Sequence, residues 1–293
     1  MADFPAHNPI WLESLVGRTE ATVQLISEGN KVSSMTNHSE IADQLWRATV
    51  RGETISSIAT AHPGLGLDGA YAIQALMVEK REAAGAVRTG RKLGVTAAGG
   101  MKMFNITEPV HGVLFATGAV PNGGAIAIGG QVLQPRLETE LGFIMAKDVN
   151  AVPSSLDRLA DAVAAAVPCY EVAGSRIDGW PKAIEDLVAD SCVFAAYVIG
   201  EGRVKPTTLD LESLAISISK NGEHLADGTG AECMGSPLNA LMWLVDKLVA
   251  RGEGLKAGDL VLTGALGGMV SVEAGDSYTS TFNGLGSVSV QFV

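Results

Sequence analysis

The chain has 293 residues, with 32 acidic and 21 basic side chains and a formal net charge of −11 at pH 7. This charge repels nucleic-acid backbones and anionic membranes, so a small anionic ligand would need a local positive centre. The apolar fraction of 47% and the 35 glycines indicate a globular chain with many tight turns and few disordered tracts.

The first 34 residues are mixed in character, and we interpret them as an N-terminal extension without a catalytic role. A helical cap is expected over residues 35–88, because the stretch 68–85 has apolar residues at helical spacing and ends in Gly85, a suitable stop. The G-x-G-x-x-G stretch "GLGLDG" at 64–69 follows no convincing strand. It is therefore interpreted as a loop leading into a helix rather than as a phosphate-binding turn.

Residues 89–293 are expected to form a β-rich catalytic domain of short apolar runs separated by Gly, Pro and Asp. Two helices should interrupt it, one over 154–167 that ends at Pro168 and one over 237–252. The last 36 residues, 258–293, look like strands joined by glycine turns. The fold class predicted from this pattern is α+β, with a small helical cap on a β-rich body.

The three cysteines, Cys169, Cys192 and Cys233, are widely spaced in apolar surroundings and form no C-x-x-C motif. Buried thiols in a reducing compartment are the better interpretation. No apolar run reaches the length of a membrane span, and the N-terminus lacks the pattern of a secretory signal. We therefore expect a cytoplasmic protein with no membrane and no nucleic-acid partner.

None of the five histidines is paired with another at metal-ligand spacing, which argues against a zinc site. A G-x-S-x-G nucleophile elbow is also absent, and the histidines offer no obvious partner for a serine triad. Covalent acyl chemistry is therefore disfavoured.

Carboxylates stand out in "QPRLETELGF", residues 134–143, where Glu138 and Glu140 lie two positions apart in an apolar setting. On a strand they would share one face, about 7 Å apart along the backbone. Glu171 is a third acidic residue in a strand-like apolar run. Either these side chains are half exposed or paired with Arg136 or Arg176, or they form an oxygen-rich site for Mg²⁺ or Mn²⁺.

Lys92 lies in "GRKLGVT", a short predicted strand, between Arg91 and Leu93. A lysine in a strand is commonly an edge residue that prevents aggregation. The alternative is functional: Lys92 would bring positive charge or a proton to an anionic substrate held by the metal.

Several stretches resemble one family in their order and spacing, from about residue 70 to the C-terminus. They are "GRKLGVT", "VLQPRLETELGFIM", "EVAGSRIDGW", "VADSC", "GTGAECMGSPLNALMWL", "LVLTGALGGMVSVEAGD" and "GLGSVSVQF". This set resembles the 2-keto-4-pentenoate hydratases of aromatic meta-cleavage pathways. These enzymes belong to the fumarylacetoacetate hydrolase superfamily, beside 2-oxohepta-3-ene-1,7-dioate hydratase and 4-oxalocrotonate decarboxylase.

The resemblance implies a fumarylacetoacetate hydrolase-like mixed β-roll with an N-terminal helical cap, in a homo-oligomer. It implies Mg²⁺ or Mn²⁺ on Glu138, Glu140 and Glu171, with Lys92 as the active-site lysine. Leu93, Ser175 and Thr263 would contact the substrate. The implied substrate is a small 2-oxo or 2-hydroxy-dienoate such as 2-hydroxypenta-2,4-dienoate, which is hydrated to a 4-hydroxy-2-oxo acid.

One position departs from the hydratase pattern, which has Glu-Pro-Asp-aromatic-Gly where this chain has "EPVHG", residues 108–112. The related decarboxylases also carry an apolar residue at the place of Val110, and valine cannot accept a proton from water. His111 is the candidate substitute base, provided that the turn at Pro109 breaks the alternation of strand side chains.

Four functions follow from the resemblance and from this departure. Hydratase leads, a 2-oxo-enoate decarboxylase is second, and acylpyruvate-type C–C hydrolysis is third by analogy within the superfamily. The fourth alternative is a metal-dependent binding module without catalysis.

Overall fold

Two β-sheets form the framework of the computed structural model, which describes residues 37–293. The strands of the larger sheet are β1 (Arg88–Gly94), β2 (Val110–Phe115), β3 (Ala119–Val120), β5 (Arg136–Met145), β6 (Val163–Ala173), β7 (Phe194–Ile199) and β10 (Leu260–Ser271). They lie in the order β2-β1-β10-β5-β6-β7-β3. The smaller sheet contains β4 (Ala125–Ile126), β8 (Ala215–Lys220), β9 (Glu223–Thr229), β11 (Ser277–Phe282) and β12 (Gly286–Phe292), in the order β4-β12-β11-β8-β9.

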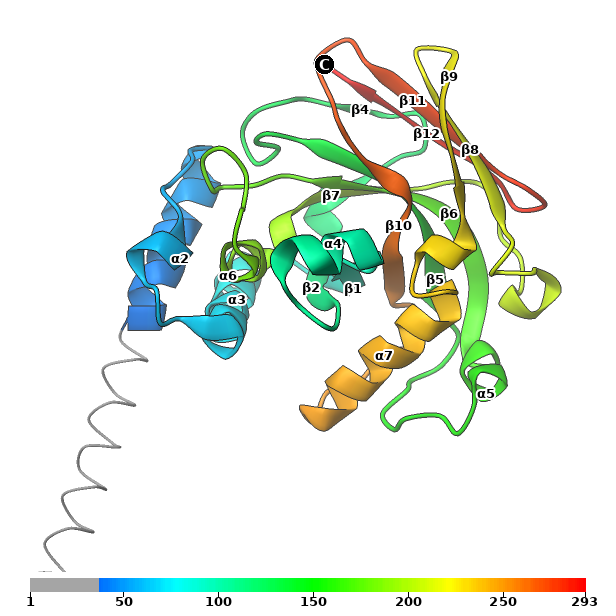
Figure 1. Cartoon of the computed structure of the whole chain (residues 1–293), viewed down its shortest axis with the longest axis horizontal. Helices are drawn as coiled ribbons and strands as arrows, with labels where there is room; N and C mark the ends of the chain where they lie inside the picture. Colours follow the sequence, from blue (N-terminus) through cyan, green and yellow to red (C-terminus); the bar gives the residue numbers. More distant parts are fainter. Residues whose placement is uncertain (1–36) are drawn as a thin grey trace, which may run out of the picture.

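Helices surround these sheets. The first described helix covers residues 37–51, and it is followed by α2 (Ile58–Ala61), α3 (Gly66–Ala83), α4 (Ala98–Phe104), α5 (Leu156–Ala160), α6 (Ile184–Ala189) and α7 (Pro237–Ala250). Short 3-10 turns are η1 (Ala116–Gly118), η3 (Pro206–Thr208) and η4 (Gly230–Glu232), whereas the short turn η2 (Ser191–Val193) has positive φ angles. Figure 1 shows α2, α3 and α6 grouped on one side of the molecule, away from the smaller sheet. Within residues 37–293, no helix combines the length and apolarity needed to cross a membrane.

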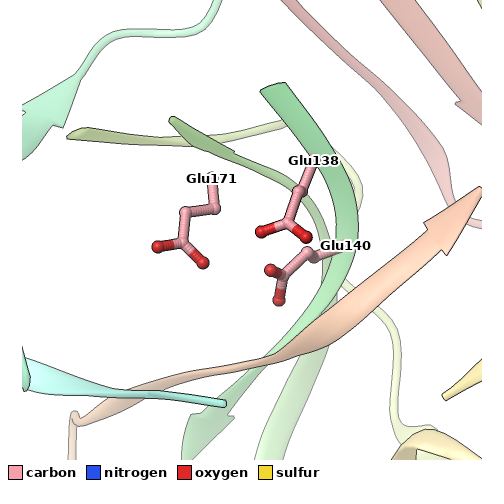
Figure 2. A group of neighbouring side chains, drawn as sticks. All are labelled: Glu138, Glu140 and Glu171. Carbon is pink, nitrogen blue, oxygen red and sulfur yellow. The ribbon is translucent and has the colours of Figure 1, made fainter. Parts of the chain in front are cut away.

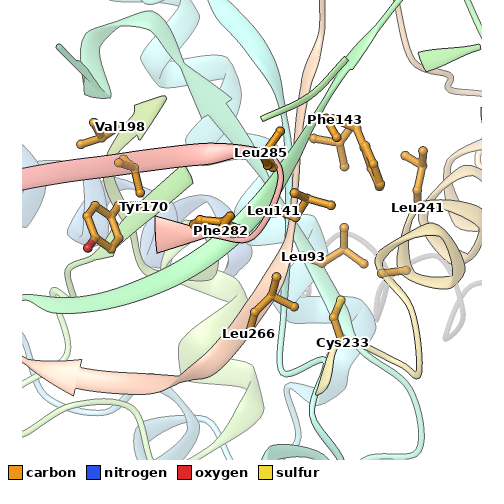
Figure 3. Packing of buried hydrophobic residues seen from close by; sticks show 14 of the residues in the cluster. Leu93, Leu141, Phe143, Tyr170, Val198, Cys233, Leu241, Leu266, Phe282 and Leu285 are labelled. Atoms are coloured by element: carbon orange, nitrogen blue, oxygen red, sulfur yellow. The ribbon is translucent and has the colours of Figure 1, made fainter. Parts of the chain in front are cut away.

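The largest hydrophobic cluster lies between the two sheets and α7 (Figure 3). It contains Leu141 and Phe143 of β5, Phe282 of β11 and Leu241 of α7, all of them fully buried or nearly so. Alternate residues of β5 point into this cluster, because successive side chains of a strand face opposite ways. The core therefore fixes which residues of β5 remain for the other face.

A second cluster joins the N-terminal helices to the larger sheet. Leu45, Ile73 and Met77 pack there with Val188 of α6 and Val110 of β2. The helix over 37–51, α2 and α3 lie in the region predicted as a helical cap, and β1 begins at Arg88, while the division into a cap over 35–88 and a catalytic domain over 89–293 stays a prediction. The helical region buries its apolar face against the sheet rather than forming a core of its own. The predicted extension over 1–34 lies outside the described residues.

The predicted α+β class is confirmed, because helices combine with two sheets that contain both parallel and antiparallel strand pairs. The helix predicted over 237–252 is confirmed as α7, Pro237–Ala250. Within the glycine-rich stretch at 64–69, Gly64 and Leu65 lie in the short loop after α2, and residues 66–69 are already the first turn of α3, so the stretch follows no strand and the interpretation as a loop leading into a helix agrees with the structure.

The helix predicted over 154–167 is wrong for most of its length. Only Leu156–Ala160 is helical, and β6 already begins at Val163. Pro168, expected to end that helix, lies inside β6, where its carbonyl accepts a hydrogen bond from Gly200 just beyond the end of β7. In an antiparallel strand the N–H and C=O of one residue point toward the same neighbouring strand. The N–H that proline lacks would therefore also point toward β7, and no hydrogen bond to β5 is lost. Pairing with β5 outweighed the local helical pattern.

Candidate active site

Three carboxylates converge on the larger sheet. In the antiparallel pairing of β5 with β6, Glu138 stands directly opposite Glu171, and Glu140 lies two residues further along the same face of β5. One oxygen from each of the three side chains lies within 4.8 Å of the others. Figure 2 shows the two glutamates of β5 pointing toward the glutamate of β6.

The intervening residue of β5 shows why the acidic side chains are separated from the main core. Thr139 points to the opposite face, and its hydroxyl lies 2.9 Å from the Ser280 hydroxyl of β11. Tyr170, the residue before Glu171, lies 2.8 Å from the same hydroxyl. The sheet thus directs these polar contacts toward the smaller sheet and the glutamates away from it.

Burial opposes ionisation of the carboxylate group. Glu140 and Glu171 are fully buried and Glu138 is half-buried. Burial, reinforced by the charge of Glu171, raises the pKa of Glu138 to about 7. Burial and the two neighbouring carboxylates raise the pKa of Glu140 well above its usual range, and burial also raises the pKa of Glu171. A cation at this position would relieve the repulsion that these shifts reflect.

Lys92 is the positive partner of the group. It lies on β1, which is flanked by β2 and β10, so it is not the edge lysine that one interpretation predicted. Its side chain is 2% exposed, and Nζ lies 2.6 Å from Glu171 Oε1 and donates a hydrogen bond to the Cys192 carbonyl at 3.0 Å. Burial lowers the pKa of Lys92, but Glu171, Glu138 and Glu140 outweigh it and raise the pKa overall. Lys92 is therefore charged.

The residues present fit a hard divalent cation. Among residues 37–293, Glu140 Oε1 and both carboxylate oxygens of Glu171 are buried without a hydrogen-bond partner, although Glu171 Oε1 forms the ion pair with Lys92. Neither of the two arginines predicted as alternative partners forms an ion pair with these carboxylates. Arg176 is paired with Asp190, and Arg136 stacks over Trp180. Three carboxylates against one ammonium leave a net negative, oxygen-only donor set, which Mg²⁺ and Mn²⁺ prefer.

Side chains predicted to contact substrate have protein partners in the structure. The Ser175 hydroxyl donates to Asp190 at 3.1 Å and accepts from the Ile177 amide at 2.9 Å. Thr263 donates its hydroxyl to the Leu141 carbonyl at 2.8 Å. Leu93 points into the main hydrophobic cluster, on the face of β1 opposite Lys92. Substrate contact by these three residues stays a prediction.

His111 and Val110 separate onto different faces of β2. The register pairs Val110 with Gly94 and His111 with Leu93. A side chain at Gly94 would begin 3.4 Å from Val110 Cγ2 and 3.9 Å from Lys92 Nζ, so Val110 lies on the lysine side. The alternation is not broken at Pro109, and the structure does not bring the candidate base His111 to the carboxylates.

The surroundings of His111 are aromatic and cationic. Its ring centroid lies 4.9 Å from that of Tyr71 and 6.3 Å from that of Trp243. Burial, with Arg91 and Arg251 nearby, lowers the pKa of His111 to about 3, so the ring is neutral above that pH. It forms part of a cavity of about 300 Å³ that also includes Gln74 and Tyr71.

Two contributors to the site were not predicted from the sequence. The Gly264 amide donates to Glu140 Oε2 at 2.6 Å, and the Cys192 carbonyl accepts from Lys92. Glycine within the apolar run "LVLTGALGG" is a signal for a bulge or a close backbone approach, so Gly264 could have been suspected. No sequence signal marks a backbone carbonyl such as that of Cys192.

Comparison with known sequences gives consistent results. Residues 91–293 match the family model described as fumarylacetoacetate (FAA) hydrolase, C-terminal. The chain is 36% identical over 254 residues to 2-keto-4-pentenoate hydratase of Paraburkholderia xenovorans, covering 86% of this chain and 94% of the relative. It is 33% identical over 250 residues to 2-hydroxyhexa-2,4-dienoate hydratase of Comamonas testosteroni, covering 85% and 95%.

Solved structures show the same architecture. The 4-oxalocrotonate decarboxylase of Pseudomonas putida G7, complexed with magnesium and adipate, superposes with a TM-score of 0.84 at 27% identity, covering 88% of this chain and 98% of that one. The fumarylpyruvate hydrolase of Pseudomonas aeruginosa, in complex with Mn²⁺ and pyruvate, gives a TM-score of 0.55 at 20% identity and covers 71% and 89%, which supports the fold alone.

Proposed function

Since this chain belongs to the fumarylacetoacetate hydrolase family, we propose that it hydrates 2-hydroxypenta-2,4-dienoate, or a substituted analogue, to a 4-hydroxy-2-oxo acid. The names of the hydratase relatives, at 33–37% identity over most of the chain, support this substrate class. The observation that carries the proposal is the buried convergence of Glu138, Glu140 and Glu171 beside a charged lysine.

In this proposal the three glutamates hold Mg²⁺ or Mn²⁺. The bound ion would supply a Lewis acid that polarises the 2-oxygen of the substrate. The Gly264 amide fixes one oxygen of Glu140, which orients that carboxylate. The same cation charge would compensate the anionic cluster, so that a substrate carboxylate can approach a site that is otherwise negative.

Lys92 is the residue that we assign to handle protons and substrate charge. Its ammonium can donate to the substrate carboxylate or to the 2-oxygen as negative charge develops there. In the overall reaction C4 gains a hydroxyl, C3 and C5 each gain one proton, and the enol oxygen loses its proton, so exactly one water is consumed. A lysine beside the site stabilises the charge that passes through the 2-oxygen during these transfers.

A decarboxylase is the second candidate, because Val110 places a methyl group rather than a proton acceptor on the lysine side of β2. Loss of CO₂ from a 2-oxo-enoate dicarboxylate needs the same stabilised enolate but no activated water. The structural similarity to 4-oxalocrotonate decarboxylase is consistent with this alternative.

Purified protein with Mg²⁺ should be offered 2-hydroxypenta-2,4-dienoate and, separately, 2-oxo-3-hexenedioate. The proposal expects loss of the ultraviolet absorbance of the dienoate and a product heavier by one water in mass spectrometry, and both should be lost in Glu140→Gln. Release of CO₂ from the dicarboxylate without hydration of the dienoate would instead establish the decarboxylase.

We also propose that the enzyme is a cytoplasmic homo-oligomer. The free, buried thiols of Cys169, Cys192 and Cys233 suit a reducing compartment. Light scattering on the purified protein would measure its oligomeric state.

A further inference from the structure

A left-handed turn lies directly behind Lys92. Ser191, Cys192 and Val193 have φ angles of 57°, 49° and 54°, so three successive residues other than glycine adopt the left-handed conformation. L-residues avoid this region because Cβ approaches the backbone, and a β-branched valine is especially unfavourable there. Such a conformation persists only where the surrounding structure enforces it, which is a common property of functional sites.

Contacts on both sides of the turn enforce it. Asp190, the residue before the turn, accepts hydrogen bonds from the Arg176 amide and guanidinium at 2.8 and 2.5 Å. At the other end, the Val193 carbonyl accepts from the Gly174 amide at 2.6 Å. Arg176 and Asp190 are completely buried, so this ion pair ties the turn to the end of β6.

Cys192, at the centre of the turn, contacts both β1 and β2. Its carbonyl accepts from Lys92 Nζ at 3.0 Å, and its thiol donates to the His111 carbonyl at 3.0 Å. Gly112 leaves the necessary room, since a Cβ there would lie 3.0 Å from Cys192 Cβ. The thiol thus holds the turn against β2 through the His111 carbonyl, and the Cys192 carbonyl accepts the hydrogen bond from Lys92 of β1.

The hydrogen bonds of the ammonium can be counted. Lys92 has three N–H donors, and the Cys192 carbonyl accepts one of them at 3.0 Å. Nζ also lies 2.6 Å from Glu171 Oε1 in an ion pair that lacks the geometry of a hydrogen bond. Within residues 37–293 no other acceptor is hydrogen-bonded to the ammonium, so the Cys192 carbonyl fixes one N–H and donor capacity remains for a ligand.

We propose that the left-handed turn Ser191–Val193 is a positioning device, in which Cys192 orients the Lys92 ammonium so that an N–H that no protein acceptor takes is presented to the substrate. The inference rests on the proposed function for the identity of the substrate group that accepts this hydrogen bond. The orientation itself is a property of the protein, and it can be measured without turnover. Cys192 acts through Lys92 and is a positioning residue.

The first test reads the ammonium directly. In protein labelled with ¹⁵N-lysine and saturated with Mg²⁺, Lys92 should give a slowly exchanging ammonium signal, assigned by its loss in Lys92→Met. Cys192→Ala removes the thiol anchor and should speed proton exchange about tenfold, as expected for the loss of one hydrogen bond. Cys192→Ser keeps a donor and should restore slow exchange. A rate unchanged in Cys192→Ala, or no slow signal in the wild type, overturns the proposal.

Cys233→Ala is the matched control, because its thiol also donates to a backbone carbonyl of the larger sheet, that of Thr263 at 2.8 Å. Cys233→Ala should lower the melting temperature about as much as Cys192→Ala does, while the Lys92 ammonium signal stays unchanged. A similar acceleration of exchange in this variant would show a general loosening of the core and would also contradict the proposal.

Kinetics supply the second test. In Cys192→Ala, kcat should fall about tenfold with KM within about twofold of the wild type, because orientation matters most in the transition state. Cys192→Ser should recover kcat. If the wild type hydrates no dienoate, the proposed function fails but the exchange measurement still decides the positioning; wild-type kcat in Cys192→Ala with hydration intact would reject the positioning alone.

Discussion

At the scale of single residues, Lys92 combines full burial with one carboxylate partner, Glu171. We predict that Lys92→Met lowers kcat about 100-fold or more, the usual effect of losing a charged group that handles protons. It should also lower the melting temperature of the metal-free protein, because Glu171 is left buried without its partner. Steady-state kinetics and thermal denaturation measure these effects. A kcat within about threefold of the wild type would make the lysine only structural.

Gly264 supports Glu140 through a backbone conformation that other residues avoid. Its φ is +111°, and a Cβ would lie 2.1 Å from Thr96 Oγ1. Gly264→Ala should therefore displace the amide that donates to Glu140, weaken Mg²⁺ binding measured by calorimetry, and lower stability by more than the 1–3 kcal/mol or so of backbone strain alone.

Gly268→Ala is the control for this glycine, because Gly268 lies on the same strand with φ +78° and open space around it. Gly268→Ala should lose only the stability that corresponds to backbone strain, and its Mg²⁺ affinity should equal that of the wild type. Equal loss of affinity in both variants would mean that the Gly264 contact is unimportant.

At the scale of elements, the alternation of side chains along β2 determines the surroundings of the adjacent residues Val110 and His111. It places Val110 beside Lys92 and leaves His111 neutral among Tyr71, Trp243 and two arginines. The unfolded chain binds one proton more than the folded chain between pH about 6.5 and about 3, because the folded pKa of His111 is the lower one. The free energy of unfolding is therefore not reduced by protonation of His111 above pH about 6.5, and it decreases as the pH falls below that value.

We predict that His111→Gln flattens the fall in the free energy of unfolding between pH 7 and pH 4, relative to wild type, by up to about 3 kcal/mol at about 1.4 kcal/mol per pKa unit. Urea unfolding at several pH values measures the difference. His224→Gln, the same substitution at an exposed histidine, provides the control for the change of side chain. Parallel profiles for wild type and His111→Gln would contradict the buried neutral state.

At the scale of the whole molecule, the carboxylate cluster links metal binding to stability. Two buried carboxylates and one half-buried carboxylate, all with raised pKa values, are compensated by one lysine, so the folded state should gain from a divalent cation. At about 100 times its Kd, Mg²⁺ should add about 2.7 kcal/mol, which is roughly 4–5 °C in Tm for a chain of this size. Differential scanning calorimetry measures the shift. Glu140→Gln should reduce it, and an undiminished shift in that variant would place the metal elsewhere.

The cluster shared between the N-terminal helices and the sheet predicts the result of truncation. A chain that begins at Arg88 loses Leu45, Ile73 and Met77, and leaves Val188 and Val110 uncovered. We expect it to lose cooperative unfolding and near-ultraviolet circular dichroism. A chain that begins at residue 35 should keep both, as the predicted role of residues 1–34 as an extension requires. A cooperatively folding chain from Arg88 would show that the β-rich part is independent.

Local patterns in the sequence determined those features that depend on near neighbours. Alternation along one strand was enough to place Glu138 and Glu140 on a common face, and the 3.6-residue pattern was enough to predict α7. Apolar surroundings also singled out Glu171 and Lys92, the family resemblance implied their roles as metal ligand and active-site lysine, and the structure brings both to the same cluster.

Only the tertiary structure decided what depends on contacts distant in sequence. The register of β6 on β5 places Glu171 opposite Glu138, and the same pairing turns 163–167 into strand where the local pattern predicted helix. The left-handed turn at Cys192 is unfavourable for its own residues and exists because Arg176 and Gly174 hold its two ends. Local periodicity reports which face a side chain occupies, whereas the partner across that face is fixed by the packing of the whole chain.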